Sequence, residues 1–109
     1  MSCYYREYCN WNNYTKKFED CDGYEEASLF KLNDNETMLT HVIEDRETTY
    51  YISSSKRDVQ YDVWTFNATS DTGNDYYFVL DPKNKQVRIV FKSDGEMKMV
   101  RFYVKAIFR

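Results

Sequence analysis

The chain has 109 residues and a net charge of −3, and 42% of its residues are hydrophobic. This length is typical of one domain with a single core, and an 18% aromatic content with only three glycines and one proline excludes disordered and collagen-like chains. The acidic balance argues against nucleic acid as a partner, and no apolar run reaches the ~18 residues of a membrane-spanning helix. We therefore expect a single soluble domain over residues 1–109.

The N-terminal segment, residues 1–24, differs in pattern from the rest. Large apolar residues recur there at steps of four, three, seven and three, which is the spacing of one helical face. The residues on this face are Tyr4, Tyr8, Trp11, Phe18 and Cys21. The spacing predicts a short helical or irregular cover over residues 1–24 that buries these aromatic side chains. Tyr5 and Tyr14 lie off the face and are expected to be free for a partner.

From residue 27 onward the pattern is that of strands separated by polar turns. The expected strands span residues 27–32, 37–43, 48–53, 59–66, 76–80, 86–92 and 97–108. Short connections rich in Asn, Asp, Ser and Gly favour antiparallel neighbours, because parallel strands need long crossovers. Asp94-Gly95 between two alternating segments is a strong hairpin signal.

Alternation along the expected strands predicts which side chains share a face. Val87, Ile89 and Phe91 lie on one face of the strand 86–92. The last strand has an apolar face formed by Val100, Phe102, Val104, Ala106 and Phe108. We therefore predict a mainly β, β-dominated α+β fold: an antiparallel meander of about seven strands over residues 27–108, either closed as a small barrel or curled over one layer, with the N-terminal cover on one face or end.

The cysteines give no metal signal. Cys3, Cys9 and Cys21 lack a paired Cys-x2-Cys, and three is an odd number, so we expect buried or free thiols, no metal and no cofactor. Such thiols and the absence of an apolar leader favour a cytoplasmic protein. The alternative is a secreted glycoprotein, because Asn13, Asn35 and Asn67 each begin an Asn-x-Thr sequon.

The chain offers little for catalysis. His41 is the only imidazole, and no nucleophile motif accompanies it. Asp71-Thr72-Gly73 resembles the triplet of aspartic proteases, but its flanks are polar where that family's are apolar, which predicts a hairpin loop. A small hydrolase built on His41 or Asp71 is therefore the third of three hypotheses.

The eleven tyrosines favour a first hypothesis. Exposed tyrosine is a frequent anchor of protein interfaces, so we predict a small non-catalytic protein-binding module of inhibitor, immunity or adaptor type, which binds another protein or a second copy of itself. The residues expected to contact the partner are Tyr5, Tyr14, Tyr51, Tyr77, Arg101, Tyr103 and Lys105. The alternative is a barrel that binds a small molecule in an aromatic-lined interior.

Overall fold

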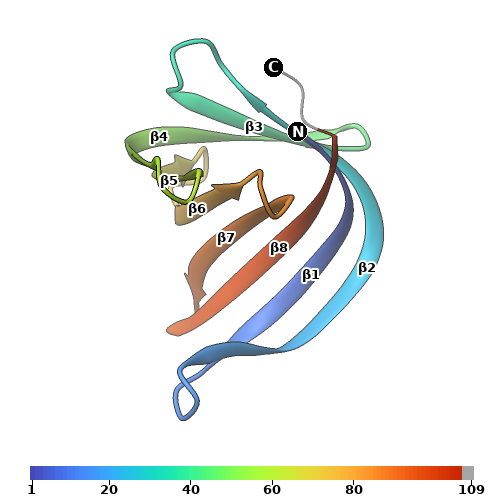
Figure 1. The fold of residues 1–109 in the computed structure, drawn as a ribbon, viewed down its shortest axis with the longest axis vertical. Coiled ribbons are helices and arrows are strands. Elements are labelled where there is room, and N and C mark those ends of the chain that lie inside the picture. The colour runs from blue at the N-terminus through green and yellow to red at the C-terminus, as the bar shows by residue number, and fades with distance from the viewer. Residues whose placement is uncertain (107–109) are drawn as a thin grey trace.

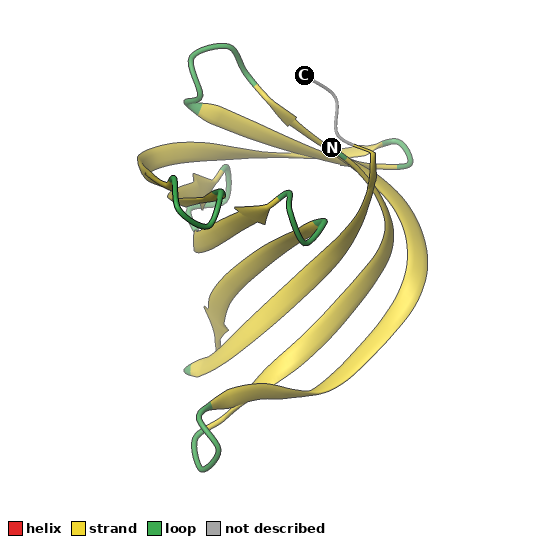
Figure 2. Cartoon of the chain, viewed as in Figure 1, coloured by secondary structure: helices red, strands yellow, loops and turns green. Residues whose placement is uncertain are grey.

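Eight strands follow one another along the chain, and each pairs antiparallel with its neighbours in sequence. They are β1 (Ser2–Asn12), β2 (Lys17–Leu32), β3 (Met38–Ile43), β4 (Arg46–Asp58), β5 (Val63–Ser70), β6 (Asp75–Asp81), β7 (Gln86–Ser93) and β8 (Glu96–Ala106). The computed structural model describes residues 1–106. Within them no helix is long and apolar enough to cross a membrane; Figure 2 shows only strands and connecting loops.

The sheet closes on itself because β1 pairs with β8 as well as with β2. Figure 1 shows this closure as the blue β1 lying between the cyan β2 and the red β8. The predicted antiparallel meander is thus confirmed in its closed form, with eight strands instead of about seven. Closure pairs the first strand with the last, whereas the part of β2 before Ser28 pairs with β1 alone and keeps one unpaired edge.

Alternation of side chains places the core inside the barrel. The buried side chains that point inward are Val87 and Ile89 on β7 and Val100, Phe102 and Val104 on β8, which confirms both predicted faces. Phe108 of the predicted face lies outside the described residues. Two of the largest buried side chains, Phe66 and Phe78, are register partners on β5 and β6, and their rings stack with centroids 4.9 Å apart.

Turn chemistry fixes the register of the hairpins. Asp94 and Gly95 both have positive φ, 53° and 80°, as the two central residues of a type I′ turn require, so the predicted hairpin between β7 and β8 is confirmed. The predicted strand 59–66 is wrong in its first half. Residues 59–62 form a turn in which the Asp58 carboxylate accepts hydrogen bonds from two backbone N–H groups, and Val59 is 87% exposed.

The predicted N-terminal helix is wrong, because residues 2–12 and 17–32 form β1 and β2. The pairing of β1 is irregular: its register with β2 shifts between Cys3 and Tyr5 and between Tyr8 and Asn10, where two residues of β1 face three of β2, and its register with β8 shifts around Cys3. As a result Tyr4 is 51% exposed and Tyr8 is also exposed, while Trp11 and Phe18 are half-buried against each other.

The barrel has two unlike ends. Met1 and the turns 33–37, 59–62 and 82–85 lie at one end, which we call the N-terminal rim. The turns 13–16, 44–45, 71–74 and 94–95 lie at the opposite rim. There the β1–β2 hairpin extends well beyond the rest of the barrel (Figure 1).

Candidate functional site

A hollow of about 740 Å³ opens at the N-terminal rim, and we call it the cup. Its wall is formed by inward-facing apolar side chains of β2, β3, β5 and β6, together with Met1. These are Phe30, Leu32, Leu39, Trp64 and Leu80. Leu39, Phe30 and Leu80 are buried, while Met1, Leu32 and Trp64 are half-buried. The cup is therefore a recess with a mainly apolar wall.

The strands build this recess because each contributes its inward side chains at the level of the rim. Leu32 and Leu39 are register partners in the β2–β3 pair, and Trp64 and Leu80 are partners in the β5–β6 pair. At this rim the turn 33–37 joins β2 to β3, the turn 59–62 precedes Trp64, and the turn 82–85 follows Leu80. An interior of eight strands is just wide enough to hold one small ligand when side chains leave part of it empty.

Charged side chains border the mouth of the cup. They are Lys31, Glu36, Arg57 and Asp62, two of each sign. Arg57 Nη2 lies 3.5 Å from Asp62 Oδ1 in an exposed pair, which contributes little to stability. The charges of these four side chains cancel, and the terminal ammonium of Met1, which also lines the cup, donates a hydrogen bond of 2.8 Å to the Phe30 carbonyl oxygen.

Deeper in the barrel lies an interior polar cluster of Arg6, Glu26 and His41. Arg6 Nη2 forms an ion pair of 2.8 Å with Glu26 Oε1, and Arg6 Nη1 donates a hydrogen bond of 2.7 Å to the hydroxyl oxygen of Tyr8. The guanidinium carbon lies 4.7 Å from the ring centre of Phe102. This cation–π contact places the head of Arg6 against the core of the barrel.

His41 is 6% exposed and is held between two aromatic rings. Its ring lies parallel to Phe30 at 4.1 Å and edge-on to Phe102 at 4.9 Å. Burial, assisted by the positive charge of Arg6, lowers the pKa of His41 to about 4. The imidazole is therefore neutral at physiological pH. Because Phe30 also lines the cup, the cup wall and the interior polar cluster share one side chain.

Several buried polar atoms of this region have no hydrogen-bond partner among the described residues. They are Arg6 Nε, Glu26 Oε1, Ser28 Oγ and His41 Nε2. Glu26 Oε1 is close enough to Arg6 for an ion pair, but the angles are not those of a hydrogen bond. Leaving such atoms unpaired costs about 1–3 kcal/mol each, so buried polar groups are normally satisfied by water or by a ligand.

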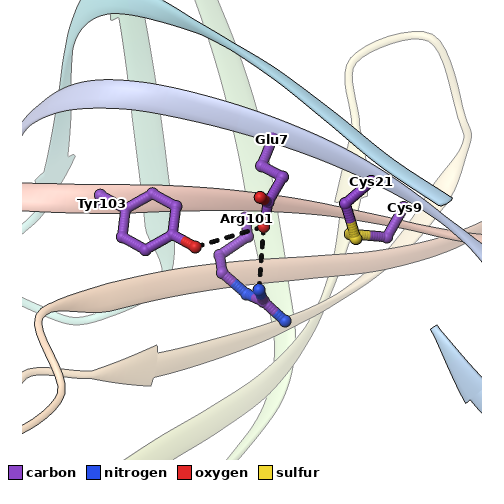
Figure 3. The surroundings of a disulfide bond; sticks show 5 residues. All are labelled: Glu7, Cys9, Cys21, Arg101 and Tyr103. Atoms are coloured by element: carbon purple, nitrogen blue, oxygen red, sulfur yellow. Dashed lines mark hydrogen bonds and ion pairs between the residues drawn. A yellow bond between two sulfur atoms is a disulfide. The ribbon is translucent and has the colours of Figure 1, made fainter. Parts of the chain in front are cut away.

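The outer face of the β1–β8 seam brings together three of the residues predicted to bind a partner. Arg101 Nη1 and the Tyr103 hydroxyl both donate hydrogen bonds to Glu7 Oε1, at 2.9 and 3.2 Å, and the rings of Tyr5 and Tyr103 meet edge to face at 5.6 Å. Figure 3 shows Glu7, Arg101 and Tyr103 pointing toward one another beside the disulfide between Cys9 and Cys21. All four side chains of this network are half-buried and occupied with one another.

The remaining predicted contact residues lie apart from the seam or at its end. Lys105 is exposed at the end of β8, and Tyr14 is 98% exposed in the turn 13–16. Tyr51 and Tyr77 are 50% and 41% exposed on the outer faces of β4 and β6, with β5 between them. Tyr103 pairs with Gln86 and Tyr77 pairs with Val90, so the tyrosines form no single row.

The cysteines differ from the prediction. Cys9 and Cys21 form a disulfide between β1 and β2, so the expectation of three thiols is wrong for these two. Cys3 is a buried free thiol, as predicted, and burial raises its pKa to about 11. Glu7 lies within 4.8 Å of the disulfide sulfurs, but sulfurs joined in a disulfide have no thiolate to offer a metal ion.

The two residues considered for catalysis lie in unlike places. His41 faces the interior, whereas Asp71 is exposed in the turn 71–74 at the opposite rim, as the hairpin prediction requires. An imidazole with a pKa of about 4 is also a weak base at neutral pH. The structure therefore gives the hydrolase hypothesis no support. Comparisons with protein-family models, with curated proteins and with solved structures give no match for this chain.

Proposed function

We propose that this protein is a non-catalytic binding protein that holds a small, mainly apolar molecule in the cup. The observation that carries the proposal is an open recess of about 740 Å³ inside a closed eight-stranded barrel. A recess of this size is in the range of small-molecule sites, which are concave, mostly apolar and largely preformed. The second of the three sequence hypotheses is thus the one that the geometry favours.

The rim and wall define the class of ligand. The charged side chains at the mouth cancel, and the wall is aliphatic and aromatic, so burial of apolar surface supplies the binding free energy. A molecule with a strongly charged group in the wall region would be disfavoured, because an unpaired charge is costly to remove from water. The expected ligand is uncharged over the part that enters the cup.

Trp64 provides a reporter for binding, because it lines the cup, whereas Trp11, the second tryptophan, packs on Phe18 in the protruding hairpin. In a Trp11→Phe background, the neutral dye Nile red and unbranched alcohols are titrated and the emission of Trp64 is recorded. We expect saturable quenching by the dye and competition by the longer alcohols.

Two matched variants locate the site. Leu32→Arg places a charge on the half-buried cup wall and is expected to weaken dye binding at least tenfold, about 1.4 kcal/mol. Met38→Arg places the same charge on the exposed outer face of β3 and should leave binding unchanged. Circular dichroism confirms that both variants fold. Absence of saturable binding, or equal effects of the two variants, would contradict the proposal.

Protein binding through exposed tyrosines is a second proposal, supported by the exposure of Tyr51 and Tyr77 and by a groove of about 880 Å³ that Tyr77 lines together with residues of β5, β6 and β7 near the turn 71–74. The occupant to test first is a second copy of the chain. Native mass spectrometry over a concentration series would show a dimer that Tyr51→Ala/Tyr77→Ala abolishes. A monomer at every concentration would contradict self-association through this groove.

A further inference from the structure

The disulfide indicates where the protein folds. Cys9 and Cys21 lie on neighbouring strands with their Cα atoms 4.2 Å apart, within the reach of a covalent bond in the folded barrel. Disulfides form and persist in oxidising compartments, and they are rare where glutathione keeps thiols reduced. The third cysteine is compatible with such a compartment, because Cys3 is buried inside the barrel and cannot reach an external thiol or oxidant.

A second, independent observation concerns the three Asn-x-Thr sequences. The structure exposes all three asparagines at the surface: Asn13 in the turn 13–16, Asn35 in the turn 33–37 and Asn67 on the outer face of β5. Three sequons in 109 residues are a mild excess over chance, but burial of any of the three asparagines would have argued against its modification. All three asparagines are exposed, so none is excluded from modification by burial.

The local hydrogen bonds leave the asparagine nitrogens available. Asn13 Oδ1 accepts a hydrogen bond of 2.9 Å from the Trp11 indole N–H, which engages the oxygen and not the amide nitrogen. The Asn67 amide nitrogen donates a hydrogen bond of 3.0 Å to Ser54 Oγ. An amide nitrogen that carries a sugar keeps one N–H, so the bond from Asn67 to Ser54 is compatible with modification.

We propose that this protein folds in an oxidising secretory compartment and carries N-linked glycans at Asn13, Asn35 and Asn67. In the modification, the asparagine amide nitrogen forms a bond to C1 of an oligosaccharide carried on a lipid diphosphate. The bond between C1 and the diphosphate oxygen breaks, the lipid diphosphate leaves, and the amide nitrogen loses one proton. In disulfide formation, the two thiols give two electrons and two protons to an oxidant protein disulfide, which is reduced to a dithiol.

The proposed glycans would cover some faces of the barrel and leave another face uncovered. Asn67 is the register partner of Tyr77, so a sugar there would cover the outer face of β5 and β6. A sugar on Asn13 would stand next to Tyr14 in the turn 13–16. The outer face of β7, β8 and β1 carries no sequon and stays bare. A sugar on Asn35 would stand on the turn 33–37, beside Glu36 at the mouth of the cup, so the outer face of β7, β8 and β1 is the one that glycosylation would leave open to a protein partner.

The first experiment uses the native protein purified from its natural source. Its intact mass is measured before and after an N-glycosidase that releases the sugar and converts the asparagine to aspartate. We expect a heterogeneous mass that collapses to one value, three aspartates at positions 13, 35 and 67, and one alkylatable thiol after unfolding without reductant. An unmodified chain, or three alkylatable thiols, would overturn the proposal.

The second experiment assigns the sites. The chain is produced behind a cleavable signal peptide in a eukaryotic cell, and gel mobility is followed in both the medium and the cell extract, so that a variant that folds poorly and is retained is still scored. Thr15→Ala, Thr37→Ala and Thr69→Ala should each remove one glycan. The matched variants Thr15→Ser, Thr37→Ser and Thr69→Ser keep the sequon and should keep the glycan. If the Thr→Ala variants migrate like the wild-type chain, as the Thr→Ser variants should, the assignment is refuted.

Discussion

Reduction of the Cys9–Cys21 disulfide is expected to destabilise the barrel by a predictable amount. The bond joins residues 12 apart in sequence, and the chain-entropy relation for a loop of that size gives about 3 kcal/mol at 25 °C. Urea unfolding is followed by fluorescence with and without dithiothreitol. At a typical urea dependence for a small domain, the midpoint should fall by roughly 2 M in the reductant.

A variant and a control make this prediction specific. Cys9→Ala/Cys21→Ala should have the midpoint of the reduced wild-type protein and should not respond to dithiothreitol. Cys3→Ala loses a buried thiol that takes no part in the bond, so its midpoint should be lower in both conditions, but it should keep the full response to the reductant. A wild-type midpoint that is equal in both conditions would refute the reasoning, since it would mean that the bond is absent or does not restrict the unfolded chain.

Three further measurements probe the interior. The pKa of His41 is about 4 in the barrel and 6.5 in a free chain, so the unfolded state binds the proton more readily. The free energy of unfolding should therefore fall by about 3 kcal/mol as the pH drops from 6.5 toward 4. In pH-dependent urea titrations of His41→Leu, that part of the acid sensitivity should disappear. Cys3, with a pKa of about 11, should react with Ellman's reagent at pH 8 only after unfolding, and prompt reaction of the native protein would show that the thiol is not buried. Gly23→Ala should lower the free energy of unfolding by about 1–3 kcal/mol, because the new Cβ would collide with the ring of Tyr5. In a double-mutant cycle, Tyr5→Ala should remove most of that loss, and an equal loss in both backgrounds would locate the strain elsewhere.

The second half of the fold follows closely from the sequence. The alternation of β7 and β8 is regular, and Asp94-Gly95 supplies the turn that joins them. Local pattern and tertiary packing agree there, because Val87 and Ile89 on β7 and Val100, Phe102 and Val104 on β8 all belong to the core. The prediction of an antiparallel meander rested on such segments, and it holds for them.

The first half could not be predicted in the same way. The register of the β1–β2 pair shifts twice, and most residues of β2 before Ser28 are exposed, because this part of the strand pairs with β1 but has no partner in β3. The disulfide depends on the pairing of these two strands and was missed for the same reason. His41 was visible as the only histidine, but its enclosure by Phe30 and Phe102 depends on contacts between strands distant in sequence.

The seam between β1 and β8 also bears on the order in which the chain folds. The ion pair between Glu7 and Arg101 joins residues 94 apart in sequence, whereas the other strand pairs are joined by short turns. Each hairpin can therefore form early at little cost in chain entropy, but the seam cannot form until the ends of the chain meet. Until then β1 and β8 present unpaired edges, so the interval before closure is when a nascent chain is most exposed to pairing with a neighbour.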